Sequence, residues 1–176
     1  MDFVEKNGIG MRRAVQNDFE QIWNIIEDAK RMMSGSGRSQ WNETYPGKMH
    51  ITKDIASGSA YVLCKDGRIV AYGVIAMNGE PEYANLQSGE WNASGDYYVV
   101  HRLAVAEDFR GMGLAVLFLK NVEYMCARDH VRSIRIDTKN DNQEMLSLLK
   151  GLGYNYCGLI IYPINGERLA YDKVVV

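Results

Sequence analysis

Cysteine is scarce in this chain, and its arrangement argues against a disulfide-bonded protein. Only three of the 176 residues are cysteine, at Cys64, Cys126 and Cys157. They show no Cys-x-x-Cys spacing, and an odd number cannot all pair within one chain. Disulfide frameworks belong to oxidising compartments. We therefore expect a protein of a reducing compartment, the cytoplasm.

Long apolar runs and clusters of basic residues are also missing. The run Leu114–Leu119 is far shorter than the roughly 20 residues of a membrane-spanning helix. The segment Met1–Gly10 mixes charged and apolar residues, unlike a signal peptide. With a net charge of −2 and scattered Lys and Arg, nothing favours generic attraction to nucleic acid or to a membrane. We expect neither as a partner and assign no metal site, while a homodimer stays open.

The composition of the chain is that of an ordinary globular protein. Hydrophobic residues make up 47% of the sequence and charged residues 24%. A chain of this length can bury a sizeable core. No internal repeat and no low-complexity linker interrupts it. Residues 1–176 are therefore expected to form a single domain, with its core at about 10–175.

Hydrophobic periodicity predicts alternating strands and helices. Strands are expected at Met11–Val15, Ala60–Cys64, Arg68–Met77, Tyr97–Val105, Ser133–Asp137, Tyr154–Tyr162 and Leu169–Val175. Helices are expected at Phe19–Met33, Thr52–Ser57, Gly113–His130 and from Asp141 or Asn142 to Leu152. The pairs Asp66-Gly67 and Asn165-Gly166 are hairpin signals. This order predicts a mixed α/β fold, in which helices flank a central sheet.

The connection Asn78–Gly95 is unusually long for a link between two strands of a hairpin. Structureless connections beyond about 12–15 residues are usually functional or disordered. A floppy insertion and an ordered lid over a substrate both fit this segment. Pro81, Tyr83 and Trp91 within it favour the lid.

The most informative stretch is Arg110–Ala115, with the sequence Arg-Gly-Met-Gly-Leu-Ala, between a strand and a helix. A glycine-rich turn that opens a helix directs several backbone N–H groups one way, and the helix dipole adds partial positive charge. Such a turn suits a phosphate or pyrophosphate. Arg110 adds a positive charge at its rim. The stretch therefore predicts a phosphorylated cofactor.

Two common phosphate-binding motifs do not match this turn. A P-loop ends in Gly-Lys-Ser/Thr, which does not follow Gly113. A dinucleotide fingerprint needs a small residue at position 116, where this chain has Val116. Asp137, however, lies near the offset of a ribose-binding acid. A dinucleotide-binding protein therefore stays as a minor alternative.

A larger pattern surrounds the turn. The strand Tyr98–Val105 precedes Arg-x-x-Gly-x-Ala, and Ile134–Thr138 is followed by a helix that begins near Asn142 and ends in Leu-Gly-Tyr at 152–154. In this order and separation, the segments resemble the GNAT superfamily of acyl-CoA-dependent N-acetyltransferases, from Tyr97 to Tyr156. The resemblance implies a mostly antiparallel sheet of about six to seven strands flanked by helices. It also implies acetyl-CoA as cofactor and an amine as acceptor.

The resemblance further implies roles along this strand and turn. The backbone N–H of Leu103 would donate to the developing oxyanion, and Ala104 and Val105 would line the pantetheine arm. The turn residues would hold the pyrophosphate: Arg110, Gly111, Met112, Gly113, Leu114 and Ala115. Asn142 has two interpretations, a helix cap or a cofactor ligand. Asp141 with Glu144 makes a rival capping box, which would leave Asn142 free for the ligand role.

His101 is the candidate general base. Strand alternation puts it on the same face as Leu103, two residues later. An imidazole titrates close to working pH, which suits proton removal. The competing interpretation is a histidine packed and hydrogen-bonded in the sheet. Asp137, at a strand end, is a second catalytic candidate or a residue that caps a turn.

The general acid is where the chain departs from the family. Many members carry a tyrosine seven residues after the helix-starting Asn, and here that position is Leu149. Tyr154 is close in sequence, as a core aromatic or as a relocated acid. Four aromatics in expected loops are candidates for an acceptor pocket: Trp41, Tyr45, Tyr83 and Trp91.

The sequence as a whole predicts an N-acetyltransferase that moves an acetyl group from acetyl-CoA to a primary amine. The acceptor is expected to be a small or amino-acid-like molecule, with a peptide amine as the other case. A non-catalytic CoA-binding sensor or interaction module is the alternative, and the missing tyrosine at Leu149 favours it.

Overall fold

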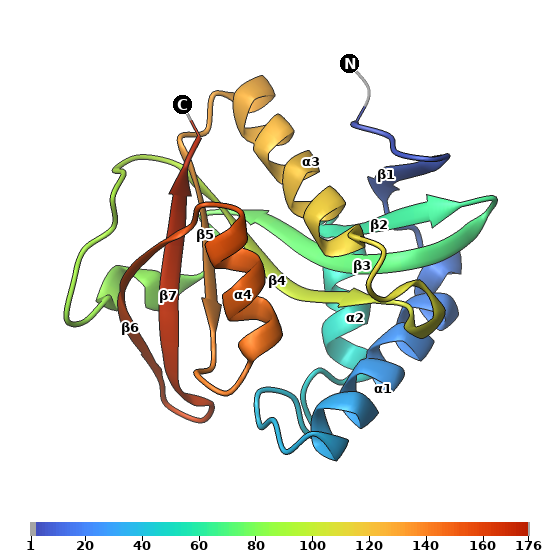
Figure 1. The fold of residues 1–176 in the computed structure, drawn as a ribbon, viewed down its shortest axis with the longest axis horizontal. Helices are drawn as coiled ribbons and strands as arrows, with labels where there is room; N and C mark the ends of the chain where they lie inside the picture. The colour runs from blue at the N-terminus through green and yellow to red at the C-terminus, as the bar shows by residue number, and fades with distance from the viewer. Residues whose placement is uncertain (1–2, 176) are drawn as a thin grey trace.

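A single twisted sheet organises the computed structural model, which describes residues 3–175 (Figure 1). Within these residues seven strands lie in the order β1-β2-β3-β4-β5-β7-β6. All neighbours are antiparallel except the parallel pair β4 and β5. The strands are β1 Ile9–Arg13, β2 Ala60–Lys65, β3 Arg68–Met77, β4 Tyr97–Val105, β5 Ser133–Thr138, β6 Asn155–Tyr162 and β7 Gly166–Val174. The expected mixed α/β fold with a mostly antiparallel sheet is confirmed.

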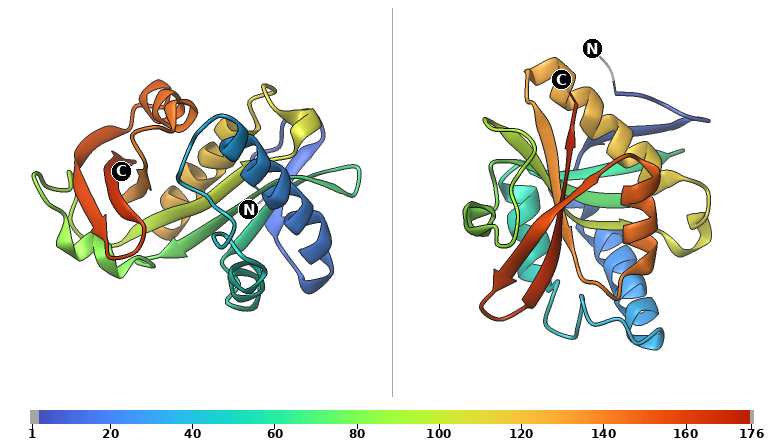
Figure 2. Two further views of the ribbon diagram at one scale, coloured as in Figure 1. Left: turned by 90° about the horizontal axis from the view of Figure 1, so that it is seen from below. Right: turned by 60° about the vertical axis from the view of Figure 1, so that its left-hand side comes forward.

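Helices cover both faces of this sheet and bury its apolar residues (Figure 2). On one face, α3 and α4 pack over a core that contains Phe118 and Leu149. On the other, α1 and α2 pack over a second core around Ile26 and Tyr72. The helices are α1 Phe19–Gly35, α2 Lys48–Ala56, α3 Leu114–Asp129 and α4 Gln143–Gly151, with short 3-10 turns η1 Gln16–Asp18, η2 Pro81–Asn85 and η3 Glu107–Phe109.

The sheet opens between β4 and β5. These two strands pair only over Tyr97–Val99 and Ser133–Arg135. Beyond Val99, β4 continues to Val105 while remaining paired with β3 on its other side. One backbone edge of the later part of β4 therefore faces a gap in the sheet, and the site described below is built there.

The segment between β3 and β4 is ordered and packs against the sheet. It contains η2, and its Tyr83 is buried with Val99 and Ile160 in a small third core. Gln87 exchanges two backbone hydrogen bonds of 2.8 Å with Leu159 of β6. In Figure 2 the segment lies on the same side of the sheet as α2. That this segment closes over a substrate as a lid stays a prediction.

The element bounds follow the sequence closely, and the differences have local causes. α2 begins at Lys48, not Thr52, because the His50 ring nitrogen Nδ1 accepts a hydrogen bond from the Gly47 N–H and caps the helix start. The cap of α4 is Asn142, whose side-chain oxygen accepts from Met145 N–H at 3.3 Å. The rival cap at Asp141 is wrong, since that carboxylate instead accepts two hydrogen bonds from Ser39.

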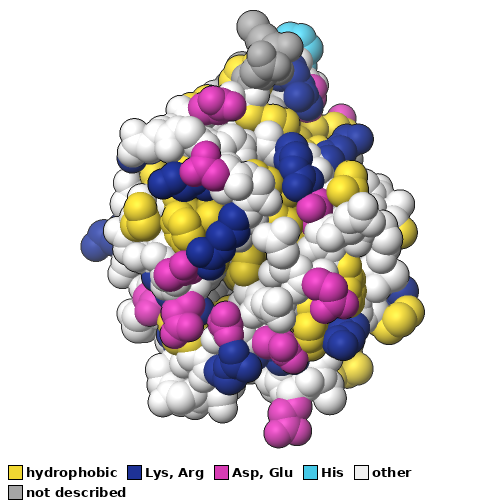
Figure 3. All heavy atoms as spheres, turned by 90° about the vertical axis from the view of Figure 1, so that its right-hand side faces the viewer, with side chains coloured by type: hydrophobic (Ala, Val, Ile, Leu, Met, Phe, Trp, Pro, Cys, Tyr) yellow, Lys and Arg dark blue, Asp and Glu magenta, His cyan; other side chains and the backbone are white. Residues whose placement is uncertain are grey.

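The surface and the helix lengths bear on possible partners. On the face that carries α1 and the turn before α3, acidic and basic side chains are interspersed (Figure 3). No single-sign charge dominates this face, so its long-range field is weak. Among residues 3–175, no helix combines the length and apolar character needed to cross a membrane.

Candidate active site

A bulge in β4 sets the geometry of the site. Tyr72 of β3 pairs with Ala104 and Val74 pairs with His101, so Gly73 alone stands opposite Arg102 and Leu103. Arg102 has a positive φ of 52°, the left-handed conformation of a bulge residue. A Cβ at Gly73 would collide with the ring of Phe118, so only glycine fits opposite this bulge.

The bulge reverses the side-chain alternation along β4. Leu103 packs against the core under α3, together with Val100. His101 lies on the other face, near the Tyr83 ring at a centroid distance of 6.3 Å. The expectation that His101 and Leu103 share one face is therefore wrong, because regular alternation does not include an inserted residue. Both still line one cavity, since it sits at the gap where the sheet opens.

Arg102, the bulge residue, is held by an ion pair from the α2 face of the sheet. Its guanidinium makes two hydrogen bonds to the Asp54 carboxylate and one of 3.0 Å to the Tyr45 hydroxyl. The Tyr72 hydroxyl also donates to Asp54. Burial, with the Asp54 carboxylate beside it, raises the pKa of Tyr72. The strained backbone at position 102 is therefore fixed by a buried network.

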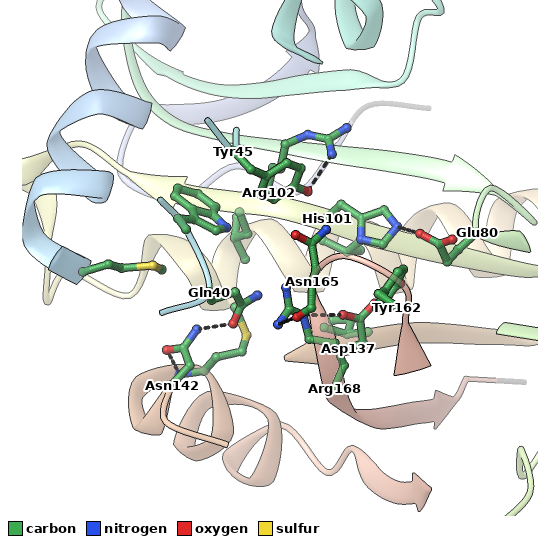
Figure 4. Close-up of a pocket in the computed structure, with 16 residues that line it drawn as sticks. Gln40, Tyr45, Glu80, His101, Arg102, Asp137, Asn142, Tyr162, Asn165 and Arg168 are labelled. Atoms are coloured by element: carbon green, nitrogen blue, oxygen red, sulfur yellow. Dashed lines mark hydrogen bonds and ion pairs between the residues drawn. The ribbon is translucent and has the colours of Figure 1, made fainter. Parts of the chain in front are cut away.

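The cavity beside the bulge is small, at about 110 Å³. Its polar lining comes from distant parts of the chain (Figure 4): Gln40, Tyr45, Glu80, His101, Arg102, Asp137, Asn142, Tyr162, Asn165 and Arg168. Met33, Trp41, Leu103 and Met145 add an apolar side. A lining of this composition can hold a small molecule with both a polar and an apolar part.

His101 and Glu80 face each other in the wall of the cavity (Figure 4). The Nε2 atom of His101 lies 3.4 Å from Oε2 of Glu80, and the two side chains are only 19% and 17% exposed. Burial acts to raise the pKa of Glu80, but His101 and the backbone amide of Glu82 outweigh it, so the pKa lies below its ordinary value. Glu80 is therefore an ionised carboxylate at neutral pH, next to the candidate base.

Asp137 lines the same cavity, and three other residues already engage its carboxylate. It accepts hydrogen bonds from the hydroxyls of Tyr83 at 2.8 Å and Tyr162 at 3.0 Å. Arg168 Nε lies 3.6 Å from its second oxygen. Burial, together with this carboxylate, raises the pKa of both tyrosines. Asp137 thus anchors the wall formed by β5 and β7.

A larger groove of about 520 Å³ adjoins the small cavity. Its walls include Leu103, Ala104 and Val105 of β4, the turn at Arg110–Ala115 except Met112, and residues of α1 and α4. Met112 is instead exposed on the surface. Five residues line both spaces, so the groove and the cavity meet there: Met33, Trp41, Leu103, Asn142 and Met145.

The turn at the end of the groove has the features of an anion site. Gly111 and Gly113 both have φ of 76°, and a Cβ at either would meet open space. Among residues 3–175, the first N–H with a backbone partner at this end of α3 is that of Leu117, so the backbone donors before it are available to a ligand. The Arg110 Nη2 atom is buried and, among residues 3–175, has no hydrogen-bond partner. These groups fit a phosphate.

Residues 39–41 bridge the opening between α1 and the β5–α4 connection. The Gln40 side-chain oxygen accepts hydrogen bonds from Thr138, Lys139 and Asn142. Trp41, which follows, is 6% exposed and stands between cavity and groove. Asn142 thus acts as a helix cap and as part of this bridge.

The four predicted loop aromatics are not brought together. Trp41 and Tyr45 line the small cavity. Tyr83 and Trp91 line a separate surface hollow under the 78–95 segment, where Arg135 lies over the Trp91 ring at 4.3 Å. Tyr83 reaches the cavity only through its hydroxyl on Asp137.

Neither position considered for a tyrosine acid, Leu149 or Tyr154, lines the small cavity. Leu149 is fully buried in the core under α3 and α4. Tyr154 is 6% exposed in the same core, its hydroxyl has no partner within the described residues, and burial raises its pKa. Tyr154 is a core aromatic.

Sequence reasoning missed several polar residues of the cavity. Asp54 could have been found, because it lies between Ile51 and Ile55 on the apolar face of α2, and a buried charge requires a partner. Glu80 carries no such signal, since it belongs to a segment without periodicity. Tyr162 and Arg168 meet Asp137 only through the pairing of β5 with β7 and β7 with β6.

Comparison with known proteins agrees with this geometry. A family model described as Acetyltransferase (GNAT) family matches residues 19–154. The uncharacterized N-acetyltransferase YesJ of Bacillus subtilis (strain 168) is 28% identical over 147 residues, covering 82% of this chain and 81% of that protein. A crystal structure of a GNAT-family acetyltransferase from Streptococcus agalactiae 2603 is 33% identical, with a TM-score of 0.86, covering 97% of this chain and 98% of that one.

A more distant structure, that of the NatC complex bound to Gag peptide and CoA, has the same fold. It is 16% identical with a TM-score of 0.67, covering 96% of this chain and 99% of that one. The family model spans most of the chain, and the relative from Streptococcus agalactiae spans nearly all of it. The chain therefore belongs to the GNAT family of acetyltransferases and is an acyltransferase enzyme.

Proposed function

We propose that this enzyme transfers an acetyl group from acetyl-CoA to the primary amine of a small or amino-acid-like acceptor, with His101 as the general base. The observation that carries the proposal is the meeting of the two spaces at Leu103: a long groove that ends in an anion site, and a small cavity that contains His101. A bisubstrate reaction needs two such spaces to converge at the reacting atoms.

The groove residues support the choice of acetyl-CoA. When bound, this molecule would supply an acetyl group activated as a thioester. The turn at Arg110–Ala115 would hold its phosphates, and the free backbone edge of Ala104 and Val105 would hold its extended arm. That the NatC complex, which has the same fold, was solved with CoA is consistent with this assignment.

The residues around Leu103 divide the work of the reaction. An amine must be uncharged to attack, and His101 removes the proton that the attacking nitrogen would otherwise keep. The Leu103 N–H donates to the negative charge that develops on the carbonyl oxygen, which is worth about 3 kcal/mol of barrier in a water-excluded site. The volume of the cavity, about 110 Å³, favours a small acceptor over a bulky one.

Substitution of the candidate base tests this proposal. His101→Ala should lower kcat by about 10²- to 10⁴-fold with an unchanged KM for acetyl-CoA. It should also remove the acid-side inflection from the pH profile of kcat/KM for the amine. His130→Asn is the matched control, because His130 is exposed and Asn tolerates its left-handed φ of 57°.

The assay is thiol release with a panel of small amines, amino acids and peptides. A His101→Ala enzyme that melts normally and turns over like the unsubstituted protein would remove His101 from the catalytic role. Turnover of peptides alone would replace the small acceptor by a polypeptide amine. Tight acetyl-CoA binding without thiol release from any amine would favour the sensor or interaction module, and tight NAD binding without CoA binding would favour the dinucleotide alternative.

A further inference from the structure

We propose that Glu80 is a positioning residue that orients His101 and stabilises its protonated form during the reaction. This inference rests on the proposed role of His101 as the base. Glu80 belongs to the segment between β3 and β4. In the sequence, this segment lies outside the strand and turn that carry the family pattern. Its carboxylate faces the imidazole across 3.4 Å in a largely buried wall (Figure 4).

The other charged side chains of the cavity already have ion-pair partners, so only His101 is available to pair with Glu80. Arg168 lies beside Asp137, and Arg102 is paired with Asp54. Within residues 3–175, the only cationic partner within ion-pair distance of Glu80 is therefore the imidazole, once it is protonated. A buried carboxylate without a partner is costly, so an imidazolium formed during the reaction would be paired with Glu80.

The remaining groups around the pair do not supply another base or cation. The Tyr83 ring packs beside His101, and its hydroxyl is used on Asp137. The Tyr162 hydroxyl also donates to Asp137, and burial and the nearby carboxylates raise the pKa of that phenol. Both phenols stay neutral at working pH, so Glu80 is the charged group that lies beside the imidazole.

The proton transfer follows from this placement. When Nε2 carries the ring proton and donates it to Glu80, Nδ1 keeps its lone pair for the acceptor amine. The N–H bond on the attacking nitrogen breaks as an Nδ1–H bond forms, and the imidazolium is then paired with the carboxylate. As the new carbon–nitrogen bond forms, the carbon–sulfur bond of the thioester breaks, and the departing sulfur takes up a proton from solvent. The proton on Nδ1 returns to solvent before the next turnover. A carboxylate that orients a histidine base in this way does not itself take up the proton.

Packing fixes Glu80 on its side of the pair. Its carboxylate accepts from the Glu82 N–H at 3.3 Å and caps η2. Further along, Gln87 is hydrogen-bonded to Leu159, and a Cβ at Gly89 would collide with the carbonyl of Cys157. The segment is therefore seated on β6 too closely to shift without breaking contacts, which holds the carboxylate beside His101.

Glu80→Gln is the informative variant, because it removes the charge and keeps the shape. We expect kcat to fall roughly 10- to 100-fold, as when a partner that orients a functional histidine is removed. The acid limb of the pH profile should move to lower pH, because the charge that favours the imidazolium is gone. The KM for acetyl-CoA should not change, and Glu80→Asp should recover part of the rate. Glu90→Gln, an exposed position in the same segment, is the control.

A double-mutant cycle separates this inference from the proposed function. If the inference holds, Glu80→Gln has no further effect in a His101→Ala background. If His101→Ala itself leaves the rate unchanged, the proposed function fails. If His101→Ala removes activity but Glu80→Gln keeps the rate and pH profile of the unsubstituted enzyme, only this inference is overturned.

Equal losses from Glu80→Gln in both backgrounds would also overturn the inference, since Glu80 would then act without His101.

NMR titration of the His101 ring provides a readout that is independent of turnover. Its midpoint should lie at lower pH in Glu80→Gln than in the unsubstituted protein. If Glu80→Gln does not fold, the same comparison is made with Glu80→Ala, which also removes the charge, and an unmoved midpoint contradicts the proposal.

Discussion

Among residues 3–175, the buried hydroxyl of Tyr154 has no hydrogen-bond partner. It lies in the core under α3 and α4, and burial raises its pKa. An unpaired buried hydroxyl costs about 1–3 kcal/mol, and the aromatic ring that carries it contributes the packing. The phenol is therefore expected to be dispensable for both stability and catalysis.

Tyr154→Phe tests this directly. The free energy of unfolding, measured in urea, should stay the same or rise by about 1 kcal/mol, because the unpaired hydroxyl is removed and the ring is kept. The kcat should not change. Tyr162→Phe is the matched control and should destabilise the protein, because the Tyr162 hydroxyl donates to Asp137. A loss of about 100-fold in kcat for Tyr154→Phe would instead assign it the role of general acid.

Single residues also mark the limit of what the sequence predicts. His101 could be named from its place in a strand that leads into the glycine turn. Its partner Glu80 could not, because no periodicity links a position in a long connection to a position in a strand. The bulge at Arg102 was equally hidden, since positive φ at a non-glycine residue has no sequence signature here.

At the scale of elements, the turn before α3 has a backbone conformation that suits the proposed anion site. Gly113 adopts φ of 76° and has open space where a side chain would project. Glycine is therefore required there for conformation and for access, but not for packing within the protein. A substitution at a second glycine with the same backbone conformation, away from the groove, shows how much of an effect comes from backbone strain alone.

Gly113→Asp should lower the affinity for acetyl-CoA at least tenfold, or about 1.4 kcal/mol, because it places a carboxylate where the phosphates would bind. Calorimetry measures this affinity. Gly67→Asp is the control, since Gly67 has φ of 78° and equally open surroundings in the β2–β3 turn. It carries the same backbone strain without the charge at the groove. Equal affinities in the two variants would contradict the assignment of the turn.

The elements themselves were largely predictable. β3 and β4 have the bounds that alternation gave, and α3 differs by one residue at each end. These long segments have one clear period each. β7 begins at Gly166, three residues before the expected Leu169. Its first three residues, Gly-Glu-Arg, pair with β6 but are too polar to show apolar alternation.

At the scale of the whole molecule, buried and paired ionisable groups predict how stability depends on pH. The hydrogen bond from Arg12 lowers the pKa of Asp18, and that from Arg128 lowers the pKa of Asp129. Such a carboxyl stabilises the fold above its unfolded value near pH 4, and the contribution is lost as pH falls through the lower folded value. Burial raises the pKa of Tyr83, and that contribution is lost as pH rises above about 10.

Burial also lowers the pKa of His50 and raises the pKa of Cys126. The free energy of unfolding should therefore be nearly level only from about pH 7 to pH 8 and fall on both sides. Urea denaturation at intervals from pH 3 to pH 11 gives the curve. Asp18→Asn should flatten part of the acid limb and leave the alkaline limb in place. A stability that rises continuously toward pH 11 would contradict the burial of the phenols.

The segment between β3 and β4 has a consequence beyond the chemistry of Glu80. β6 is the last strand of the sheet, and Gln87 pairs with it where a strand of another molecule could otherwise add. The same stretch of chain thus places a carboxylate beside His101 of β4 and covers part of the open edge of the sheet at β6. We expect that shortening this connection would both move the carboxylate away from His101 and uncover the edge of β6.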